Sequence, residues 1–413
     1  MRNEKDMPPI QWPIEGVTRA PYSVMSDPAI YRIEQERIFR GPVWHFLCLE
    51  AEIPEPGSFR TTYIGETPII VARDRDGAIN AMVNRCSHKG ALLCVETGGK
   101  RQNFTCLYHA WSYDLAGSLR SVAFQNGIAG KGGMPADFDI SQHGLERLKA
   151  ESFHGLVFGT FAAPEPLETY LGPGMAEMIT RVFHKPIEVL GYHHQVLPNN
   201  WKLYSENTRD PYHATILHAF YPTFKLNRLT MEGGITLEHG GWHSILFSKG
   251  ATFRPGEYEG TGIRSLIDDL RLADAALIES RQEFEDGITV AIQSIFPSLV
   301  HQQIYNTLAV RQLVPQGPER SELHWTIFAY KDDDPELRAM RMNQSNLIGP
   351  AGFISMEDGS IGGYVQRGIA GAASGTNAVI EMGGRDIAST TAARANETAI
   401  RGFWQAYRQL MGI

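Results

Sequence analysis

Two short segments, CSHKG at residues 86–90 and CLYHAW at residues 106–111, each carry one cysteine and one histidine. The pattern is Cys86-x-His88, then seventeen residues, then Cys106-x2-His109. Strand-like runs and glycines on both sides predict tight loops, and the flanking strands would bring the two loops together. The pattern therefore predicts a metal centre with two thiolate and two imidazole ligands, carried by a β structure.

The distribution of the four ligands favours iron over zinc. Structural zinc sites usually pair cysteine with cysteine and histidine with histidine at short spacing, whereas each loop here offers one of each. A Rieske [2Fe-2S] cluster needs that mixed arrangement, because one iron takes two cysteines and the other takes two histidines. Trp111 is in a position to shield such a cluster from solvent. Cys48 and Cys94 are interpreted as ordinary buried thiols.

Changes in the pattern of apolar, polar and turn-forming residues along the chain predict three regions and an α+β fold. Residues 1–41 form a lead-in with an expected helix from Asp27 to Arg40. Residues 42–164 break into short apolar or alternating runs between Gly, Pro and Asp turns, which predicts an all-β domain inserted before the rest. Residues 165–413 begin with two helical pieces, PLETYLG and MAEMITRVFHK. They continue with strand-like runs that include VHQQIYNTLAVRQLV, read as one stretch, and end in helices at 334–347 and 396–411, which indicates an antiparallel sheet.

A second cluster of possible metal ligands lies in NNWKLYSENTRDPYHATILHAF, residues 199–220. His213 and His218 are five residues apart, about 140° around an ideal helix, so they share a face only where the helix widens or breaks. Pro211 makes a break expected there. Asp210 also has a purely structural interpretation, as a cap before Pro211 at the first helical position.

Two histidines leave a non-haem iron site one ligand short of a 2-His-1-carboxylate triad. The segment GPAGFISMEDGSIGGYVQRG, residues 349–368, offers Glu357 and Asp358 after an apolar run. The alternative interpretation of an isolated Glu-Asp-Gly is a solvated acidic turn.

Taken in order, the CSH, CLYH, NWKLYSENTRDPYHATILH and GPAGFISMEDG segments resemble the large (α) subunit of Rieske non-haem iron ring-hydroxylating oxygenases over essentially the full length. GETPII, GGMPA, FHKP, VRQL and RGFW extend the resemblance. The chain is most similar to the branch acting on benzoate-type acids, with terephthalate as the first expected substrate. Salicylate, anthranilate and other substituted benzoates are the alternatives.

The resemblance implies an all-β Rieske domain and a helix-grip catalytic domain with a central antiparallel sheet. It implies a [2Fe-2S] cluster on Cys86, His88, Cys106 and His109. It also implies a mononuclear Fe(II) on His213, His218 and Asp358, with Asp210 as an acidic bridge to a cluster histidine of a neighbouring subunit. Many relatives carry Asp-Asp where this chain has Glu357-Asp358, so Glu357 stays open as an assisting or replacing ligand.

The resemblance further implies O2 as co-substrate and electrons from NADH through a reductase and usually a ferredoxin. The product would be a cis-dihydrodiol or a hydroxylated ring. The expected assembly is α3, or α3β3 with a small β subunit. The glycine-rich pieces lack the strand-Gly-x-Gly-x-x-Gly-helix context, so NADH must be used elsewhere.

A carboxylated substrate needs a buried cation, and arginine supplies a two-pronged donor. Arg311, in the strand-like AVRQLV, is the first candidate, and Arg394 becomes a second if the substrate has two carboxylates. A structural or surface salt bridge is the alternative for each.

Charge and hydropathy exclude several functions. The formal charge is -8, with no basic run, so nucleic acid is not expected as a partner. No apolar stretch reaches membrane-spanning length and no signal peptide is evident, which predicts a cytoplasmic protein. A pure Rieske electron carrier and a zinc-stabilised binding protein are the competing functions, and the first leaves about 250 residues and the second cluster without a role.

Overall fold

The computed structural model describes residues 10–162, 165–250, 256 and 270–413. The chain divides into two compact units, Phe39–Leu167 and a larger one formed by Met1–Ile38 with Glu168–Ile413. Residues 1–9 of the expected lead-in and residues 163–164 at the end of the expected β domain lie outside the described residues. The small unit is thus inserted into the sequence of the large one.

The small unit is built on antiparallel sheets, as its alternating runs predict. Its described strands form a seven-stranded sheet in the order β2-β11-β10-β5-β4-β3-β6 and a small sheet in the order β7-β8-β9. Tight turns join β3 to β4 and β10 to β11, and between β3 and β4 Gly65 adopts a positive φ of 54°. The strands are β2 (His45–Leu49), β3 (Ser58–Ile64), β4 (Thr67–Arg73), β5 (Ile79–Val83), β6 (Gly98–Lys100), β7 (Phe104–Thr105), β8 (Ser112–Tyr113), β9 (Leu119–Ser121), β10 (Arg147–Phe153) and β11 (Leu156–Thr160).

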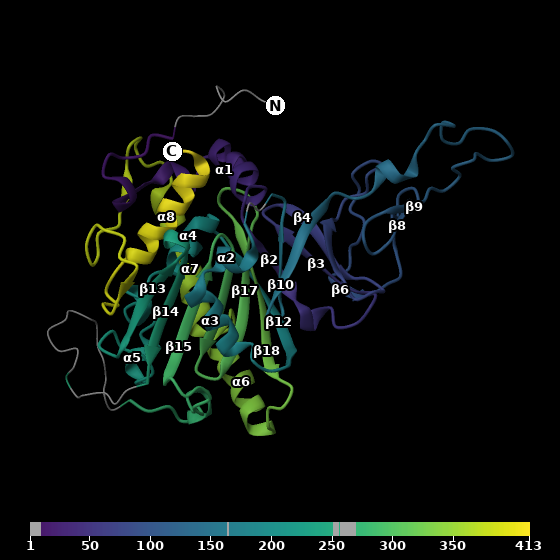
Figure 1. Ribbon diagram of the computed structural model, residues 1–413. Helices are drawn as coiled ribbons and strands as arrows, with labels where there is room; N and C mark the ends of the chain where they lie inside the picture. The colour runs from purple at the N-terminus through teal and green to yellow at the C-terminus, as the bar shows by residue number, and fades with distance from the viewer. Residues whose placement is uncertain (1–9, 163–164, 251–255, 257–269) are drawn as a thin grey trace. The chain divides into compact units, whose positions relative to one another are not determined.

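The large unit centres on an eight-stranded antiparallel sheet in the order β12-β18-β17-β16-β15-β14-β13-β20 (Figure 1). The α+β prediction is confirmed. Its strands are β12 (Ile187–Leu197), β13 (Gly233–Glu238), β14 (His243–Lys249), β15 (Ile288–Ile295), β16 (Leu299–Ile304), β17 (Thr307–Pro315), β18 (Ser321–Tyr330) and β20 (Thr390–Thr391). A separate pair joins β1 (Arg19–Pro21) to β19 (Asn377–Val379).

One strand prediction is wrong. VHQQIYNTLAVRQLV is not one strand but the hairpin of β16 and β17, turning at Tyr305 and Asn306. Tyr305 has a φ of 52° in this turn. Aromatic residues rarely adopt a positive φ, so a tyrosine in the sequence does not indicate a turn.

The helices are α1 (Pro28–Glu34), α2 (Leu167–Leu171), α3 (Pro173–Val182), α4 (Trp201–Asn207), α5 (Phe220–Thr223), α6 (Pro335–Ile348), α7 (Phe353–Ile369) and α8 (Thr398–Met411). The helices at the start of the chain, after the β domain and near the C-terminus follow the predicted positions, whereas α7 was not predicted. Asp27 caps α1 ahead of Pro28, and Asp334 caps α6 ahead of Pro335. The expected helix from Asp27 to Arg40 ends in a wider π turn at Gln35–Phe39.

Helices α3 and α7 pack on opposite faces of the large sheet (Figure 1). After α3, the Phe183 ring lies 5.1 Å from the ring of His301 and 5.0 Å from the ring of Phe328. On the other face, Gln195 of β12 donates to the carbonyl of Ser355 on α7 across 2.8 Å. Side chains alternate along a strand, so the face that α7 covers also carries the odd-numbered residues of β17 and β18.

The close approach of α7 depends on its glycines. A Cβ on Gly359 would lie 2.7 Å from Gln195 Nε2, and one on Gly363 would lie 2.9 Å from Pro198 Cγ. Both distances are shorter than real Cβ contacts. The glycines that make this segment read as a turn therefore allow a helix to lie against the start of α4 and the end of β12.

The N-terminal helix α1 joins the core of the large unit through Glu34. Its carboxylate is fully buried and accepts hydrogen bonds from Trp201 Nε1 at 2.8 Å and Tyr407 Oη at 2.7 Å. Lys202 Nζ lies 2.6 Å from the same carboxylate. One buried group thus connects α1, α4 and α8.

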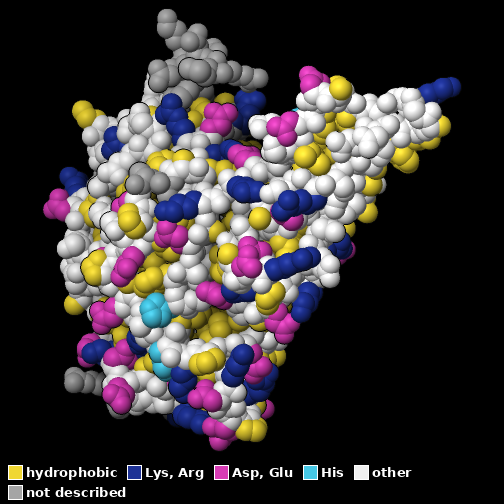
Figure 2. Space-filling view, turned by 45° about the vertical axis from the view of Figure 1, so that its right-hand side comes forward, with side chains coloured by type: hydrophobic (Ala, Val, Ile, Leu, Met, Phe, Trp, Pro, Cys, Tyr) yellow, Lys and Arg dark blue, Asp and Glu magenta, His cyan; other side chains and the backbone are white. Residues whose placement is uncertain are grey.

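The surface carries both signs of charge. On the face shown in Figure 2, Lys and Arg are interspersed with Asp and Glu rather than gathered by sign. Among the described residues, no helix is both long and apolar enough to span a membrane.

Candidate metal centres and substrate cavity

The two Cys/His loops share one backbone pattern. In the first loop, Cys86 accepts from Gly90 N at 2.9 Å and donates to the carbonyl of Ala91 at 2.8 Å. In the second, Cys106 accepts from Ala110 N at 2.9 Å and donates to the carbonyl of Trp111 at 2.8 Å. Each loop therefore closes like the other, although its histidine is placed two residues after the cysteine in one and three in the other.

The loops place thiols inside and imidazoles at the edge. Cys86 and Cys106 are 3% and 2% exposed, whereas His88 and His109 are half-buried. The two imidazole rings lie 4.6 Å apart between centroids, and Trp111 stacks on His88 at 4.7 Å with the planes 4° apart. Trp111 thus covers one face of an imidazole, as a shield would.

This donor set fits a Rieske cluster. His88 Nδ1 is buried and has no hydrogen-bond partner in the described structure, which leaves it free as a ligand atom. Cys86 Sγ lies 3.3 Å from Tyr113 Oη, and a hydroxyl can donate to a cluster-bound sulfur. Two buried thiols and two adjacent imidazoles are the ligands that such a cluster requires.

The helix that carries the second cluster breaks where Pro211 predicts. Helix α4 ends at Asn207, and a single 3₁₀ turn at His213–Thr215 follows the proline. Asp210 Oδ1 accepts from Tyr212 N at 2.8 Å and from His213 N at 3.3 Å, so it does act as a cap. The break turns two histidines five residues apart toward one point.

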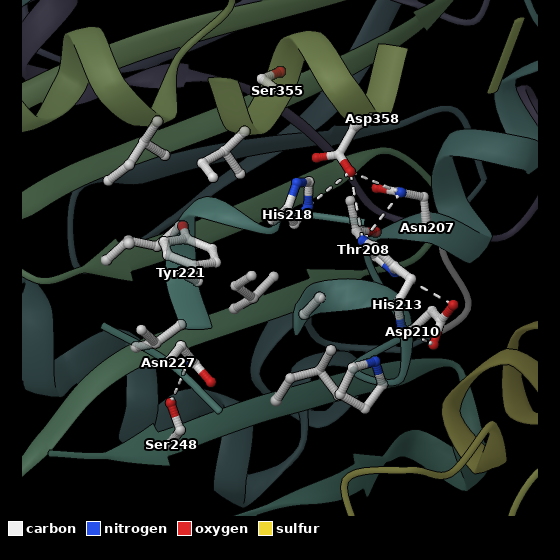
Figure 3. A pocket seen from close by; sticks show the side chains of 18 of the residues that line it. Asn207, Thr208, Asp210, His213, His218, Tyr221, Asn227, Ser248, Ser355 and Asp358 are labelled. Atoms are coloured by element: carbon white, nitrogen blue, oxygen red, sulfur yellow. Dashed lines mark hydrogen bonds and ion pairs between the residues drawn. The ribbon is translucent and has the colours of Figure 1, made fainter. Parts of the chain in front are cut away.

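Asp358 completes a triad with them. Its Oδ1 lies 3.4 Å from His213 Nε2 and 3.1 Å from His218 Nε2 (Figure 3). One nitrogen or oxygen from each of the three residues falls within 4.8 Å of the others, a spacing that one metal ion can bridge. The acidic-turn interpretation is wrong, because Asp358 lies inside α7 and is 7% exposed.

The outer nitrogens of both imidazoles also meet carboxylates. Asp210 Oδ2 lies 3.3 Å from His213 Nδ1, and Glu357 Oε2 lies 2.7 Å from His218 Nδ1. Each ring therefore points one nitrogen at Asp358 and the other at an acid outside the triad. In metal sites, carboxylates that are not themselves ligands orient the metal-bound histidines through such contacts.

The neighbouring charges in the triad shift the pKa values of its residues. Burial alone would raise the pKa of Asp358, but the hydrogen bonds and charges of the two histidines outweigh it and hold the pKa far below its usual range. Burial alone would lower the pKa of His213, but bonds to Asp210 and Asp358 raise it to about 10. A fixed negative charge between two imidazoles fits a divalent cation.

A cavity opens beside the triad, between the sheet and α7 (Figure 3). The empty space in the cavity and at its mouth, open solvent included, is about 750 Å³. Its walls are mostly apolar, from Leu246, Phe247, Val290, Ile292, Ile304, Ile348 and Ile354. Such a cavity suits a flat aromatic ring.

Both predicted arginines line this cavity. Arg311 is 4% exposed, and its Nη1 donates to Tyr204 Oη at 2.7 Å. Arg394 is 5% exposed and donates to the carbonyl of Arg228 at 2.6 Å and to Asn227 Oδ1 at 2.7 Å. Neither is a surface residue.

Two further polar residues of the site carry no signal in the sequence. Asn207 donates to Asp358 Oδ1 at 3.0 Å, and its Nδ2 also lies 3.4 Å from His213 Nε2. Tyr221 lines the cavity with its ring 5.9 Å from that of His218. Asn207 lies three residues before Asp210, and only the geometry of the break brings it to the triad.

Family models match both halves of the chain. Residues 43–130 match the Rieske [2Fe-2S] domain, and residues 185–413 match the catalytic domain of the ring-hydroxylating alpha subunit. The chain belongs to the large subunits of Rieske ring-hydroxylating oxygenases. This oxygenase therefore has a Rieske [2Fe-2S] domain followed by a catalytic mononuclear iron domain, as the resemblance implied.

Two relatives and one solved structure resemble this oxygenase over nearly the whole chain. The oxygenase is 53% identical to the terephthalate 1,2-dioxygenase terminal oxygenase component subunit alpha 2 of Comamonas sp over 98% of both chains. It is 47% identical to the anthranilate 1,2-dioxygenase large subunit of Burkholderia cepacia over 98% of this chain and 96% of that one. Its fold matches naphthalene 1,2-dioxygenase from Rhodococcus sp. with a TM-score of 0.79, covering 95% and 94% of the two chains at 23% identity.

Proposed function

We propose that this oxygenase hydroxylates terephthalate or a closely related aromatic dicarboxylate, as the terminal component of a multicomponent dioxygenase. The observation that carries the proposal is that two buried arginines line one apolar cavity next to the His213, His218 and Asp358 triad. The 53% identity to a terephthalate 1,2-dioxygenase subunit supports it.

The ligand assignments follow from the donor sets. Cys86, His88, Cys106 and His109 hold the cluster, because they supply the two thiolates and two imidazoles on paired loops. His213, His218 and Asp358 hold the mononuclear iron, because one possible ligand atom from each residue lies within 4.8 Å of the others. Glu357 meets the outer nitrogen of His218, so we assign it an orienting role.

Arg311 is suited to hold one carboxylate. Its Nη1 is engaged by Tyr204, while its Nε is buried and has no hydrogen-bond partner among the described residues. A buried guanidinium with an unpartnered N–H can donate to a carboxylate. An aromatic acid that enters an apolar cavity needs such a cation.

Arg394 is suited to hold the second carboxylate. Arg311 lies on β17, while Arg394 lies beside β13, since a Cβ on Gly233 would come 3.1 Å from its Cδ. Four strand steps separate β17 from β13, about 19 Å at the backbone. Two long side chains reaching inward from so far apart suit a rigid substrate with an acid at each end, which describes a para-dicarboxylate.

The residues around the triad prepare the ring for reaction. When bound, the mononuclear iron supplies open positions for dioxygen activation, and the cluster supplies electrons one at a time. The arginines fix the ring by its acids, and the apolar walls keep water from it. Asp210 and Glu357 hold the two imidazoles in one orientation. The expected product is a cis-dihydrodiol, or a hydroxylated ring after rearomatisation.

Electrons come from NADH through a reductase, a ferredoxin or both. Asp210, one-fifth exposed and already beside His213, serves as the bridge to a cluster histidine of a neighbouring α subunit in an α3 or α3β3 assembly. Residues 1–41 are a lead-in that packs on the catalytic domain of residues 165–413, and residues 42–164 are the Rieske domain. The protein works in the cytoplasm.

A substrate screen tests the proposal. The purified oxygenase with a reconstituted redox partner is assayed for O2 and NADH consumption and for product with terephthalate, isophthalate, benzoate, anthranilate and salicylate. We expect stoichiometric product from terephthalate. If anthranilate or salicylate alone is hydroxylated, the substrate is a monoacid, and if electrons pass without any product, the chain is an electron carrier.

Arginine variants refine that test. Arg311→Gln and Arg394→Gln should each raise the KM for terephthalate at least tenfold, because each leaves one carboxylate buried without a cation. A benzoate-type monoacid should respond to only one of the two. Arg320→Gln, at an exposed arginine paired with Glu322, is the matched control and should leave KM unchanged. Equal KM values in all three variants would refute the two-acid assignment.

A further inference from the structure

Trp325 and Arg311 form a pair on the cavity wall. Trp325 on β18 lies opposite Arg311 on β17, and Cζ of the guanidinium stands 4.7 Å from the centre of the indole ring. Trp325 is 2% exposed and lines the same cavity. Neither Trp325 Nε1 nor Arg311 Nε reaches an acceptor within the described part of the chain.

Gln302 lies on the same face of the sheet. It pairs with Ile292 on β15 and with Ala309 on β17, so it is the diagonal neighbour of Arg311, about 7–8 Å away. Ile292, Ile304 and Arg311 line the cavity, and Gln302 alternates in phase with them. It is fully buried, and neither atom of its amide has a partner in the described structure.

Three of the four unpartnered atoms are donors, namely Arg311 Nε, Trp325 Nε1 and Gln302 Nε2, and the fourth, Gln302 Oε1, is an acceptor. Burying a donor without an acceptor is unfavourable. A carboxylate offers several acceptor positions and no donor, so one such group can satisfy neighbouring donors together. A primary amide at the same place would oppose them with its own N–H groups.

We propose that Trp325 and Gln302 complete, with Arg311, a binding site for one substrate carboxylate. The indole N–H and the side-chain amide N–H donate to the carboxylate beside the guanidinium, and both residues determine specificity for an acid at that end of the ring. The inference rests on the proposed function, because it takes Arg311 as one of the two cations that hold the substrate.

The sheet supplies a matched control. Gln293 on β15 is also fully buried, and its amide also has no partner among the described residues. It pairs with His301, whose ring contacts Phe183, so it lies on the opposite face, away from the cavity. Replacing Gln293 changes the same chemistry in the same sheet without touching the proposed site.

The test measures terephthalate binding to the intact oxygenase by titration calorimetry, together with steady-state kinetics. Trp325→Phe, Gln302→Leu and Gln302→Met should each weaken binding at least tenfold and raise KM with little change in kcat. Gln293→Leu should bind as the parent does. In double variants, Gln302→Leu should be non-additive with Arg311→Gln and additive with Arg394→Gln, because only the first pair shares a carboxylate.

The outcomes separate the two proposals. If the parent binds terephthalate and the three variants bind it equally well, the donors serve only buried water and the carboxylate site is refuted, while the proposed function stands. If the parent binds none of the aromatic acids, both proposals fall. Should Gln302→Leu fail to fold, Gln302→Met and Trp325→Phe decide the question.

Discussion

Asn207 Nδ2 lies 3.0 Å from Asp358 Oδ1, joining the last residue of α4 to a residue in the middle of α7. The same oxygen faces His218 Nε2 at 3.1 Å and His213 Nε2 at 3.4 Å, so Asn207 donates to the carboxylate oxygen that both imidazoles approach. Groups that orient a metal ligand usually affect metal retention as much as activity.

We therefore expect Asn207→Leu to weaken iron binding by about 10- to 100-fold, because the Asp358 carboxylate loses its donor. Iron content after dialysis against a chelator, measured beside the retained [2Fe-2S] absorption, checks this. Asn227→Leu, at another amide lining the cavity away from the triad, should keep its iron. Unchanged iron in Asn207→Leu would show that the contact is incidental.

The two outer carboxylates should differ in their effects. Asp210→Asn keeps the shape of the side chain but removes its charge, so coupled oxygenation should be lost while both metals stay bound. Glu357→Gln should keep most turnover, because only the orientation of His218 depends on it. Product formation per NADH, with metal analysis of both variants, separates the roles. Normal coupling in Asp210→Asn would exclude the electron bridge.

Tyr113 should tune the cluster. Its hydroxyl lies 3.3 Å from Cys86 Sγ, and burial together with the Cys86 contact raises the pKa of Tyr113 to about 12, so it remains a donor. A donor stabilises the reduced, more negative cluster. Tyr113→Phe should lower the midpoint potential by about 20–60 mV, the equivalent of one net hydrogen bond for a one-electron couple. Potentiometric titration followed by electron paramagnetic resonance measures it, and Ser87→Ala, which removes a neighbour of the hydroxyl, should shift it less.

Glu206 should make stability depend on pH. Burial, opposed by the hydrogen bond from Trp404 and reinforced by Glu397 and Asp210, raises its pKa to about 7. Because this carboxyl binds its proton more tightly in the folded state, its contribution is fully present below about pH 4.5 and is lost as pH rises through 7. Glu206→Gln should raise stability by up to about 3 kcal/mol at pH 8 and by little at pH 5. Melting temperatures at both pH values decide it, and an equal gain at both would contradict the assignment.

The sequence predicted the parts of the site that have a local signature. The Cys/His loops have fixed spacing, and the break at Pro211 follows from proline chemistry, so both can be placed from the residues alone. Helix α7 cannot, because Gly359, Gly362 and Gly363 read as turn residues and their packing against β12 and α4 is a tertiary property.

The cavity wall was partly predictable. Arg311 is conspicuous as a charge inside an apolar strand, whereas Trp325 and Gln302 read as ordinary strand residues. Their shared face depends on the β16–β17 hairpin, and Tyr305 hides that turn in the sequence. The pairing register of β16, β17 and β18 brings the three side chains together.

The contact of Glu34 with Lys202 and Tyr407 bears on how the chain is made. Helix α1 leaves the ribosome before the inserted unit, and α8 leaves well after it, yet one buried carboxylate needs both. Until Tyr407 emerges, Glu34 and Lys202 lack one of the groups that shield them from solvent. The small unit can fold during synthesis, since its residues are contiguous, while the large unit can close only once α8 has emerged.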